Sequence, residues 1–450
     1  MCQKYDSMMN WEQLLSTKRF GMEEYHTENK HDRTEYQRDY DRLIFSSPFR
    51  RLQNKTQVFP LPGSIFVHNR LTHSLEVSSV GRSLGENIGR ELRKKYPDSK
   101  AHFEEMGAIV SAACLAHDLG NPPFGHSGEK AISTFFSEGK GQQLQQQMEA
   151  EGGRWTDFTC FEGNANAVRL LMHQFKGRRK GGFALTYSTL ASIVKYPHSS
   201  ELDDGKNKFG FFASEENDYK IIADELGIPC IEQQPARYAR YPLVYLVEAA
   251  DDICYQIMDI EDAYKLHLIS AEKAKELFLD FFEGEKRQYR INNLNFVSDA
   301  NEQIAYLRAS VIGLLVNECS ETFLLNEEEI LSGKFNGALI KNISKIPQEA
   351  YANCSKFAVK NIYLSKDVLD IELAGYRIIG FLLEKLTNAI QTPNHTYSKL
   401  LLERIPEQYE PDSNDLYSKV QSIIDYVSGM TDVYALDLYR KITGMGLPTI

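Results

Sequence analysis

Three stretches of this 450-residue chain place histidine or aspartate on the apolar face of a predicted helix. The stretches are 71–92, 104–118 and 243–263, where apolar residues recur every three to four positions. An unpaired carboxylate among apolar side chains is costly, so the polar positions of the three helices have to meet a compensating charge. Most other segments share the helical periodicity and alternating runs are rare, which predicts an all-α fold.

The polar positions on these helices are consistent with ligands for one divalent cation. His73, His117 and Asp251 each lie four residues from an apolar member of their stripe, and Asp118 follows His117 directly. Two carboxylates would offset the charge of the ion, and such nitrogen and oxygen ligands suit Mn, Fe, Zn or Mg-like ions. A single histidine on a helix face is more often a core residue with its hydrogen bonds satisfied than a metal ligand. Asp251 and Asp252 could simply form a helix cap or an ion pair. The same set on three separate helices is less easily accidental.

A second pair of ionisable residues follows within LAHDLGNPPFGHSGE (115–129). Two prolines end the preceding helix, and a new helix starting near Ser127 would let His126 touch Glu129. A histidine oriented by a carboxylate suits proton transfer. The alternative is that His126 caps a turn and Glu129 is an acid in the first turn of a surface helix.

Several motifs resemble one known family. NRLTHSLEV, LAHDLGNPPFGHSGE and EAADDICYQIMDIEDA are similar to the signatures of HD-domain phosphohydrolases, and more narrowly of bacterial deoxyguanosine triphosphate triphosphohydrolases. FSSPFRRLQNKTQVFPL and CFEGNANAVRLL also fit that branch. The match is specific from about residue 33 to 265 and diffuse beyond. The resemblance implies an HD-domain helical bundle with an additional helical C-terminal region, metal-dependent release of triphosphate from a deoxynucleoside triphosphate, and a homo-oligomer, with a hexamer as one candidate.

The resemblance also implies roles for individual residues. Arg70 and Lys195 match phosphate contacts, and Tyr196 would face phosphate and sugar. In the resembling enzymes the positions that match Gln57, Tyr255 and Asp259 read the deoxyribose 3′-OH. A tyrosine ring packed under C2′ of the sugar leaves no room for a 2′-OH. Without the resemblance, Tyr255 could equally be a core aromatic, and a lone Lys or Arg is usually a solvated side chain. The implied metal ligands are His73, His117, Asp118 and Asp251, the catalytic residues are His126 and Glu129, and the substrate-binding residues are Gln57, Arg70, Lys195, Tyr196, Tyr255 and Asp259.

Composition limits the partners. The net charge of −11 disfavours binding of a polyanion, so an anionic ligand would need local cations or a metal. The seven cysteines are scattered singly, without a CxxC pair, and the N-terminal residues lack a signal-peptide pattern. No apolar run approaches the length of a membrane span. We therefore expect a cytoplasmic protein without membrane contact.

The chain divides into three predicted regions. Residues 1–40 form an N-terminal arm and first helix, residues 41–270 the HD-domain catalytic core, and residues 271–450 a helical region for packing and oligomer contacts. We expect a surface insertion at 139–157, polar connectors at 283–295 and 391–415, and a short hairpin within LDDGKNKFGFFAS (202–214).

Three functions remain compatible with the sequence. The favoured one is hydrolysis of deoxynucleoside triphosphates, with dGTP as the first candidate and Mn or Mg as the first candidate metals, ahead of Fe, Co, Ni or Zn. The second is a different HD phosphohydrolase, such as a nucleotidase or phosphodiesterase. The third is a regulatory protein that binds single-stranded nucleic acid and carries a vestigial HD site. A nucleotide or single-stranded DNA effector is compatible with the first, although no motif locates an effector site.

Overall fold

Nearly all regular structure is helical in the computed structural model, which describes residues 8–25, 32–58, 67–202 and 208–446. The single sheet in these ranges is an antiparallel hairpin of β1 (Cys230–Gln233) and β2 (Ala236–Tyr238). The all-α prediction is therefore confirmed. The hairpin expected within 202–214 does not form in its described residues, and residues 203–207 lie outside the described ranges.

Three helices at the centre of the molecule correspond to the three stretches with polar positions on an apolar face. They are α4 (Arg70–Lys95), α5 (Met106–Ala116) and α12 (Val244–Lys265). The Asn69 side chain caps α4 by accepting a hydrogen bond from the Thr72 backbone N–H, and Thr72 returns a bond to the Asn69 backbone. Almost every residue of α5 is buried. The three helices therefore share one interior.

Glycines on α4 bring it close to the segment that leads into α5. A Cβ added at Gly85 would lie 2.7 Å from the backbone oxygen of Met106, and one at Gly89 would lie 2.2 Å from that of Phe103. These separations are shorter than van der Waals contact, so the two backbones can approach this closely only where no side chain intervenes. The close approach fixes the helices that carry His73 and precede His117.

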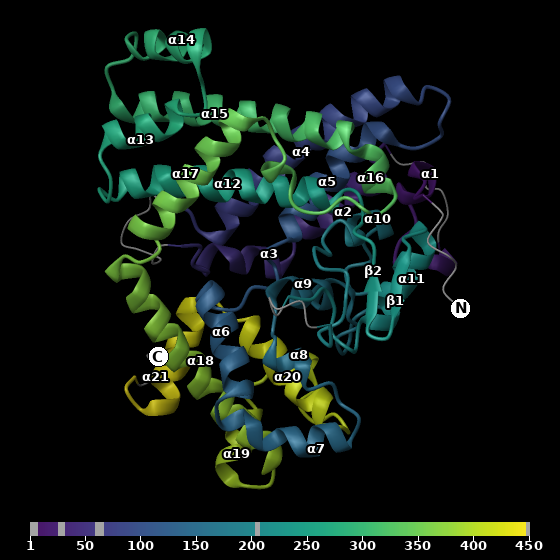
Figure 1. The fold of residues 1–450 in the computed structure, drawn as a ribbon. Helices are drawn as coiled ribbons and strands as arrows, with labels where there is room; N and C mark the ends of the chain where they lie inside the picture. The colour runs from purple at the N-terminus through teal and green to yellow at the C-terminus, as the bar shows by residue number, and fades with distance from the viewer. Residues whose placement is uncertain (1–7, 26–31, 59–66, 203–207, 447–450) are drawn as a thin grey trace.

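The other helical segments surround these three helices, and Figure 1 shows α14 above them and α6, α7, α18, α19, α20 and α21 below them. The α-helices are α1 (Trp11–Leu14), α2 (Glu35–Ile44), α3 (Ser47–Arg51), α6 (Gly125–Ser137), α7 (Gln145–Ala150), α8 (Thr156–Thr159), α9 (Gly163–Met172), α10 (Tyr187–Ala191), α11 (Glu216–Leu226), α13 (Ala271–Leu279), α14 (Gly284–Leu294), α15 (Ala300–Leu325), α16 (Glu327–Leu331), α17 (Lys345–Asn361), α18 (Lys366–Gln391), α19 (Thr396–Leu402), α20 (Leu416–Ser428) and α21 (Asp432–Thr443). The 3-10 helices are η1 (Glu23–Tyr25), η2 (Leu52–Asn54), η3 (Phe103–Glu105), η4 (Lys140–Leu144), η5 (Leu339–Lys341) and η6 (Glu407–Tyr409).

Two hydrophobic cores divide the packing. The larger core lies among α4, α5, α12 and α15, and it includes residues of the N-terminal segment and of α17. The smaller core joins α6, α7 and α8 to α18, α20 and α21, which form the lower part of Figure 1. Segments from the middle and the end of the chain therefore bury one another. The boundaries of the three predicted regions stay predictions.

The two predicted polar connectors each contain a helix. Residues 284–294 form α14, and residues 396–402 form α19. Helix α14 buries none of its residues, so it lacks the apolar stripe by which a helix is recognised from sequence. The predicted insertion at 139–157 contains η4, α7 and the first residues of α8, and it buries Leu144 and Met148 in the smaller core. Among the described residues, no helix combines the length and apolarity that a membrane crossing requires.

The contact between α4 and η3 leads to a test of stability. Alanine favours a helix over glycine, but at Gly89 its methyl group would overlap Phe103, so we expect Gly89→Ala to lower the free energy of unfolding by about 1–3 kcal/mol. Gly313 is an exposed helical control with no atom within 4 Å of an added Cβ, and Gly313→Ala should leave stability equal or up to about 1 kcal/mol higher. Chemical denaturation measures the free energy of unfolding of both variants. An equal gain in stability in the two variants would contradict the close approach of the backbones at Gly89.

Candidate active site

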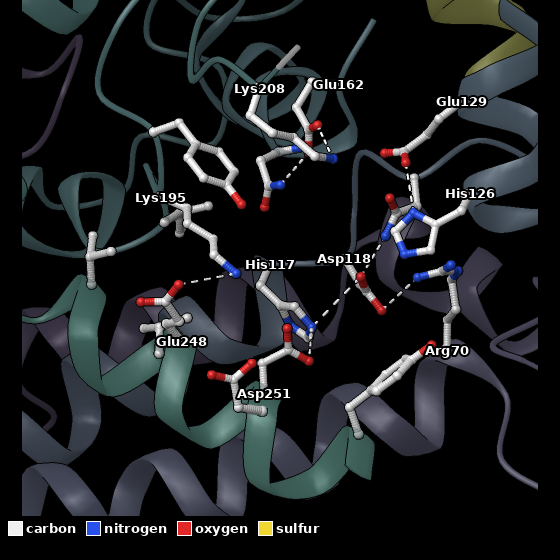
Figure 2. Close-up of a pocket in the computed structure, with 18 of the residues that line it drawn as sticks. Arg70, His117, Asp118, His126, Glu129, Glu162, Lys195, Lys208, Glu248 and Asp251 are labelled. Carbon is white, nitrogen blue, oxygen red and sulfur yellow. Dashed lines mark hydrogen bonds and ion pairs between the residues drawn. The ribbon is translucent and has the colours of Figure 1, made fainter. Parts of the chain in front are cut away.

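One cavity gathers most of the predicted site residues. It has a volume of about 310 Å³ and is lined from α4, α6, α9, α12 and the segments that join the helices. Ten of the twelve predicted residues line it, and the other two, His73 and Asp259, lie behind residues that do. Figure 2 shows charged side chains from separate elements pointing into this space. Residues far apart in the sequence therefore converge as the motif pattern predicted.

Three side chains are arranged as ligands for a cation. The Nε2 atoms of His73 and His117 lie 3.1 and 3.5 Å from Oδ1 of Asp251, and the three ligand atoms are all within 4.8 Å of one another. His117 Nδ1 donates to the Cys114 backbone oxygen at 2.6 Å, which leaves the lone pair of the ring on Nε2. That buried Nε2 has no good hydrogen-bond partner. A divalent metal ion fits this group, because it would satisfy the imidazole lone pairs and the carboxylate together.

Asp118 lies beside the three-residue group and is engaged elsewhere. Its Oδ2 is 2.8 Å from Nη1 of Arg70, and its Oδ1 accepts a hydrogen bond from the Asn121 amide. The same Oδ1 is 3.6 Å from His117 Nε2. Burial opposes charge on His117, but Asp118 and Asp251 outweigh burial and raise its pKa to about 9. The two carboxylates thus favour positive charge at this point, and the role of Asp118 as a ligand stays a prediction.

His126 and Glu129 meet on the first turn of α6. Phe124 and Gly125 adopt left-handed backbone with φ of 64° and 56°, and this turns the chain from the prolines into the helix. His126 Nδ1 is 2.8 Å from Oε2 of Glu129, and Glu129 Oε1 accepts from the Gly163 backbone N–H at 2.8 Å. The hydrogen bond and charge of Glu129 raise the pKa of His126. The His126 side chain is 67% exposed, so its Nε2 is free to face the cavity it lines.

Each cationic side chain around the cavity is paired with a carboxylate. Lys195 Nζ lies 3.3 Å from Glu248, and Lys208 bonds Glu162 (Figure 2). Tyr196 lines the same wall. Lys208 was not singled out from the sequence, because a lysine in a polar loop carries no signal. Glu248 could have been found, since it lies one helical turn before Asp251.

The residues predicted to read the sugar lie in a second group. Tyr255 lines the cavity, with its ring centroid 6.4 Å from that of His73. Gln57 also lines it, and its buried Oε1 has no hydrogen-bond partner. Asp259 lies one turn beyond Tyr255 and accepts a 2.6 Å hydrogen bond from Tyr363, and burial raises the pKa of Asp259 to about 7. Tyr363 comes from the turn that follows α17, where the sequence offered no motif.

Comparison with known proteins agrees with this geometry. Residues 70–301 match the HD domain, and residues 342–441 match the phosphohydrolase-associated domain. These matches place the chain in the class of HD-domain proteins.

Relatives define the class more narrowly. The chain is 37% identical to a deoxyguanosinetriphosphate triphosphohydrolase-like protein of Synechocystis over 98% of this chain and 100% of the relative. It is 36% identical to one of Pseudomonas aeruginosa over 98% and 100% of the two chains. A deoxyguanosinetriphosphate triphosphohydrolase of Yersinia enterocolitica is 31% identical over 90% and 93%. The chain belongs to this deoxyguanosinetriphosphate triphosphohydrolase family, which confirms the resemblance.

The three-residue group predicts the effect of losing one carboxylate. Asp251→Asn replaces a charged oxygen ligand by a neutral amide, so we expect the affinity for a divalent cation to fall by more than about 100-fold. Asp252→Asn makes the same change at the adjacent residue, which lies outside the group. Its affinity for the cation should stay close to that of the unsubstituted protein. Titration with Mn²⁺ followed by calorimetry measures both. Equal losses would mean that the group does not hold the ion.

The His126–Glu129 pair predicts a pH effect with a defined sign. Because Glu129 stabilises the protonated ring, Glu129→Gln should lower the pKa of His126, so that the ring loses its proton at lower pH. NMR titration of the His126 ring, assigned by its loss in His126→Asn, measures the midpoint. The control is Glu138→Gln at the exposed end of α6, which should leave the titration unchanged. An unchanged midpoint in Glu129→Gln would rule out the coupling.

Proposed function

We propose that the protein hydrolyses deoxynucleoside triphosphates, with dGTP preferred, to the deoxynucleoside and inorganic triphosphate. The observation that carries the proposal is the convergence, around one cavity, of a three-residue metal-type group and a histidine–glutamate pair. The names of the relatives support the substrate class. Mn or Mg is the proposed metal, held by His73, His117 and Asp251 with Asp118 beside them.

The side chains around the cavity can hold a triphosphate despite the net negative charge of the chain. Arg70, Lys195 and Lys208 line the cavity from different sides. Each is already oriented by a carboxylate, so little side-chain freedom is lost when phosphate oxygens arrive. We assign these three residues to the triphosphate.

Proton transfer falls to His126. Its Nε2 can exchange a proton with the attacking water or with the departing 5′ oxygen, while Glu129 holds the ring through Nδ1. A divalent ion, when bound, lowers the pKa of water and polarises the phosphoryl oxygen. Glu129 is itself held by the Gly163 backbone, so the pair is attached to α9 as well as α6.

Selection of the sugar is assigned to Gln57, Tyr255 and Asp259. Tyr255 lies beside His73, so a sugar next to the metal group would contact its ring. A site that pairs a hydroxyl group discriminates strongly against analogues that leave its polar groups unpaired, and the unpartnered Gln57 oxygen is such a group. The Tyr363 hydrogen bond to Asp259 fixes this wall from the C-terminal side.

Assembly and location complete the proposal. We propose a homo-oligomer in the cytoplasm, with a hexamer as the first candidate and a nucleotide or single-stranded DNA as a candidate effector. These assignments rest on membership of the family.

Turnover of the four dNTPs and of GTP, each with Mn, Mg and Co in turn, tests the function. We expect release of inorganic triphosphate and deoxynucleoside, fastest with dGTP and slow with GTP, and loss of turnover in Asp251→Asn. Chromatography identifies the products. Nucleoside mono- or diphosphates would indicate a different HD phosphohydrolase instead. Binding of single-stranded DNA by Asp251→Ala without turnover of any dNTP by the unsubstituted protein would indicate a regulatory nucleic-acid-binding role.

A further inference from the structure

A buried carboxylate outside the metal group connects two segments of the active site. Asp432 is the first residue of α21 and is 7% exposed. Its Oδ2 accepts hydrogen bonds from the backbone N–H and the hydroxyl of Thr56, at 2.8 and 2.5 Å. Its Oδ1 accepts from the backbone N–H of Phe124 at 2.9 Å. We call these three hydrogen bonds the Asp432 bridge. They join the start of α21 to two segments that lie more than 300 residues earlier in the sequence.

The Thr56 side of the bridge leads to α4 and the sugar group. Thr56 precedes Gln57 and forms an isolated antiparallel bridge with Asn69, the residue that caps α4. The Arg70 backbone N–H donates to the Lys55 oxygen at 3.3 Å. A shift of Thr56 would therefore move Gln57 and the start of the helix that carries Arg70.

The Phe124 side of the bridge leads to the proton-transfer pair. Phe124 is the left-handed residue directly before Gly125 and His126. A Cβ added at Gly375 of α18 would lie 2.9 Å from the Phe124 Cβ, so the Phe124 side chain packs tightly on that helix. A non-glycine residue with positive φ is strained and persists only where its surroundings hold it. The Asp432 hydrogen bond and the α18 contact supply that restraint.

Lys55 forms a second connection between the same regions. It is a buried lysine whose Nζ donates to the backbone oxygens of Asn121, at 2.5 Å, and Ser428, at 2.8 Å. Asn121 in turn donates to Asp118. The segment from Asp118 to His126 is thus held at two points. Lys55 connects its first part to the last residue of α20, and the Asp432 bridge connects its last part to α21.

We propose that Asp432 is a positioning residue for the reaction: through Phe124 and Thr56, its carboxylate sets the location of His126 relative to Gln57 and the helix of the metal group. The proposal rests on the proposed function. It assigns a task to the phosphohydrolase-associated region, residues 342–441, whose matched stretch includes Asp432 and Gly375. Asp432 touches neither the cavity nor the metal group, so it acts only through the two segments it holds.

Asp432→Asn separates positioning from folding. The amide oxygen can still accept from Thr56, but the amide nitrogen would then face the Phe124 N–H, so the Phe124 side of the bridge is lost. Because small misplacements of a reacting group are costly to rate, we expect kcat to fall by about 10- to 100-fold. KM and the affinity for Mn²⁺ should stay within about threefold, because the substrate cations and the metal group are untouched.

Two control variants define the outcome. Asp437→Asn makes the same substitution on α21 at a half-exposed residue that pairs with Lys441, and it should leave kcat unchanged. Thr56→Val removes one hydroxyl and keeps the Phe124 hydrogen bond, so its loss of kcat should be much smaller than that of Asp432→Asn. The proposal is wrong if folded Asp432→Asn keeps its kcat, or if KM and metal affinity change as much as kcat.

Amide hydrogen exchange of the unsubstituted protein tests the bridge without a variant. The Phe124 amide should exchange as slowly as the backbone amides in the interior of α21. In Asp432→Asn, if that variant folds, the Phe124 amide should exchange faster. Rapid exchange at Phe124 in the unsubstituted protein would overturn the proposal. If that protein hydrolyses no dNTP, the proposed function fails, while slow exchange at Phe124 would still establish the bridge.

Discussion

The structure depends on one electrostatic constraint: two imidazoles and a carboxylate meet at the junction of three largely buried helices. Helices α4 and α12 bring His73 and Asp251 to this point, and the end of α5 brings His117. Removing such groups from water is unfavourable unless their charges and lone pairs are matched. The glycine-mediated approach of α4 to the start of α5 belongs to the same core, so close packing holds the helices whose ends carry the ligand atoms.

The charges around the cavity are balanced in pairs. Arg70 faces Asp118, Lys195 faces Glu248 and Lys208 faces Glu162. Unpaired lysine or arginine side chains in a cavity would attract any anion. A side chain that is already paired binds only a ligand that can compete with its carboxylate partner. A triphosphate with several charged oxygens can compete at all three pairs at once. A singly charged anion cannot, so under the proposed function the pairing would contribute selectivity that the count of lysines and arginines alone would not indicate.

Much of this site could be predicted because helical periodicity fixes which side chains share a face. The predicted stretch 71–92 corresponds to α4 at Arg70–Lys95, and His73 lies on its buried face. Other features depend on contacts that no local pattern encodes. Helix α14 buries nothing, so periodicity could not find it, and the partners Lys208, Tyr363 and Asp432 become visible only when distant segments meet. The roles of the individual site residues and the region boundaries remain predictions, because side-chain proximity alone does not test them.

The shared core of α6 with α18, α20 and α21 has a consequence for dissecting the protein. Phe136 and Ile132 of α6 are fully buried in this shared core. A fragment ending at residue 301, where the HD-domain match ends, would leave that face of α6 open to solvent on the helix that begins with His126. The two matched regions are therefore interleaved rather than modular, and a recombinant half would be prone to aggregation instead of behaving as a minimal enzyme.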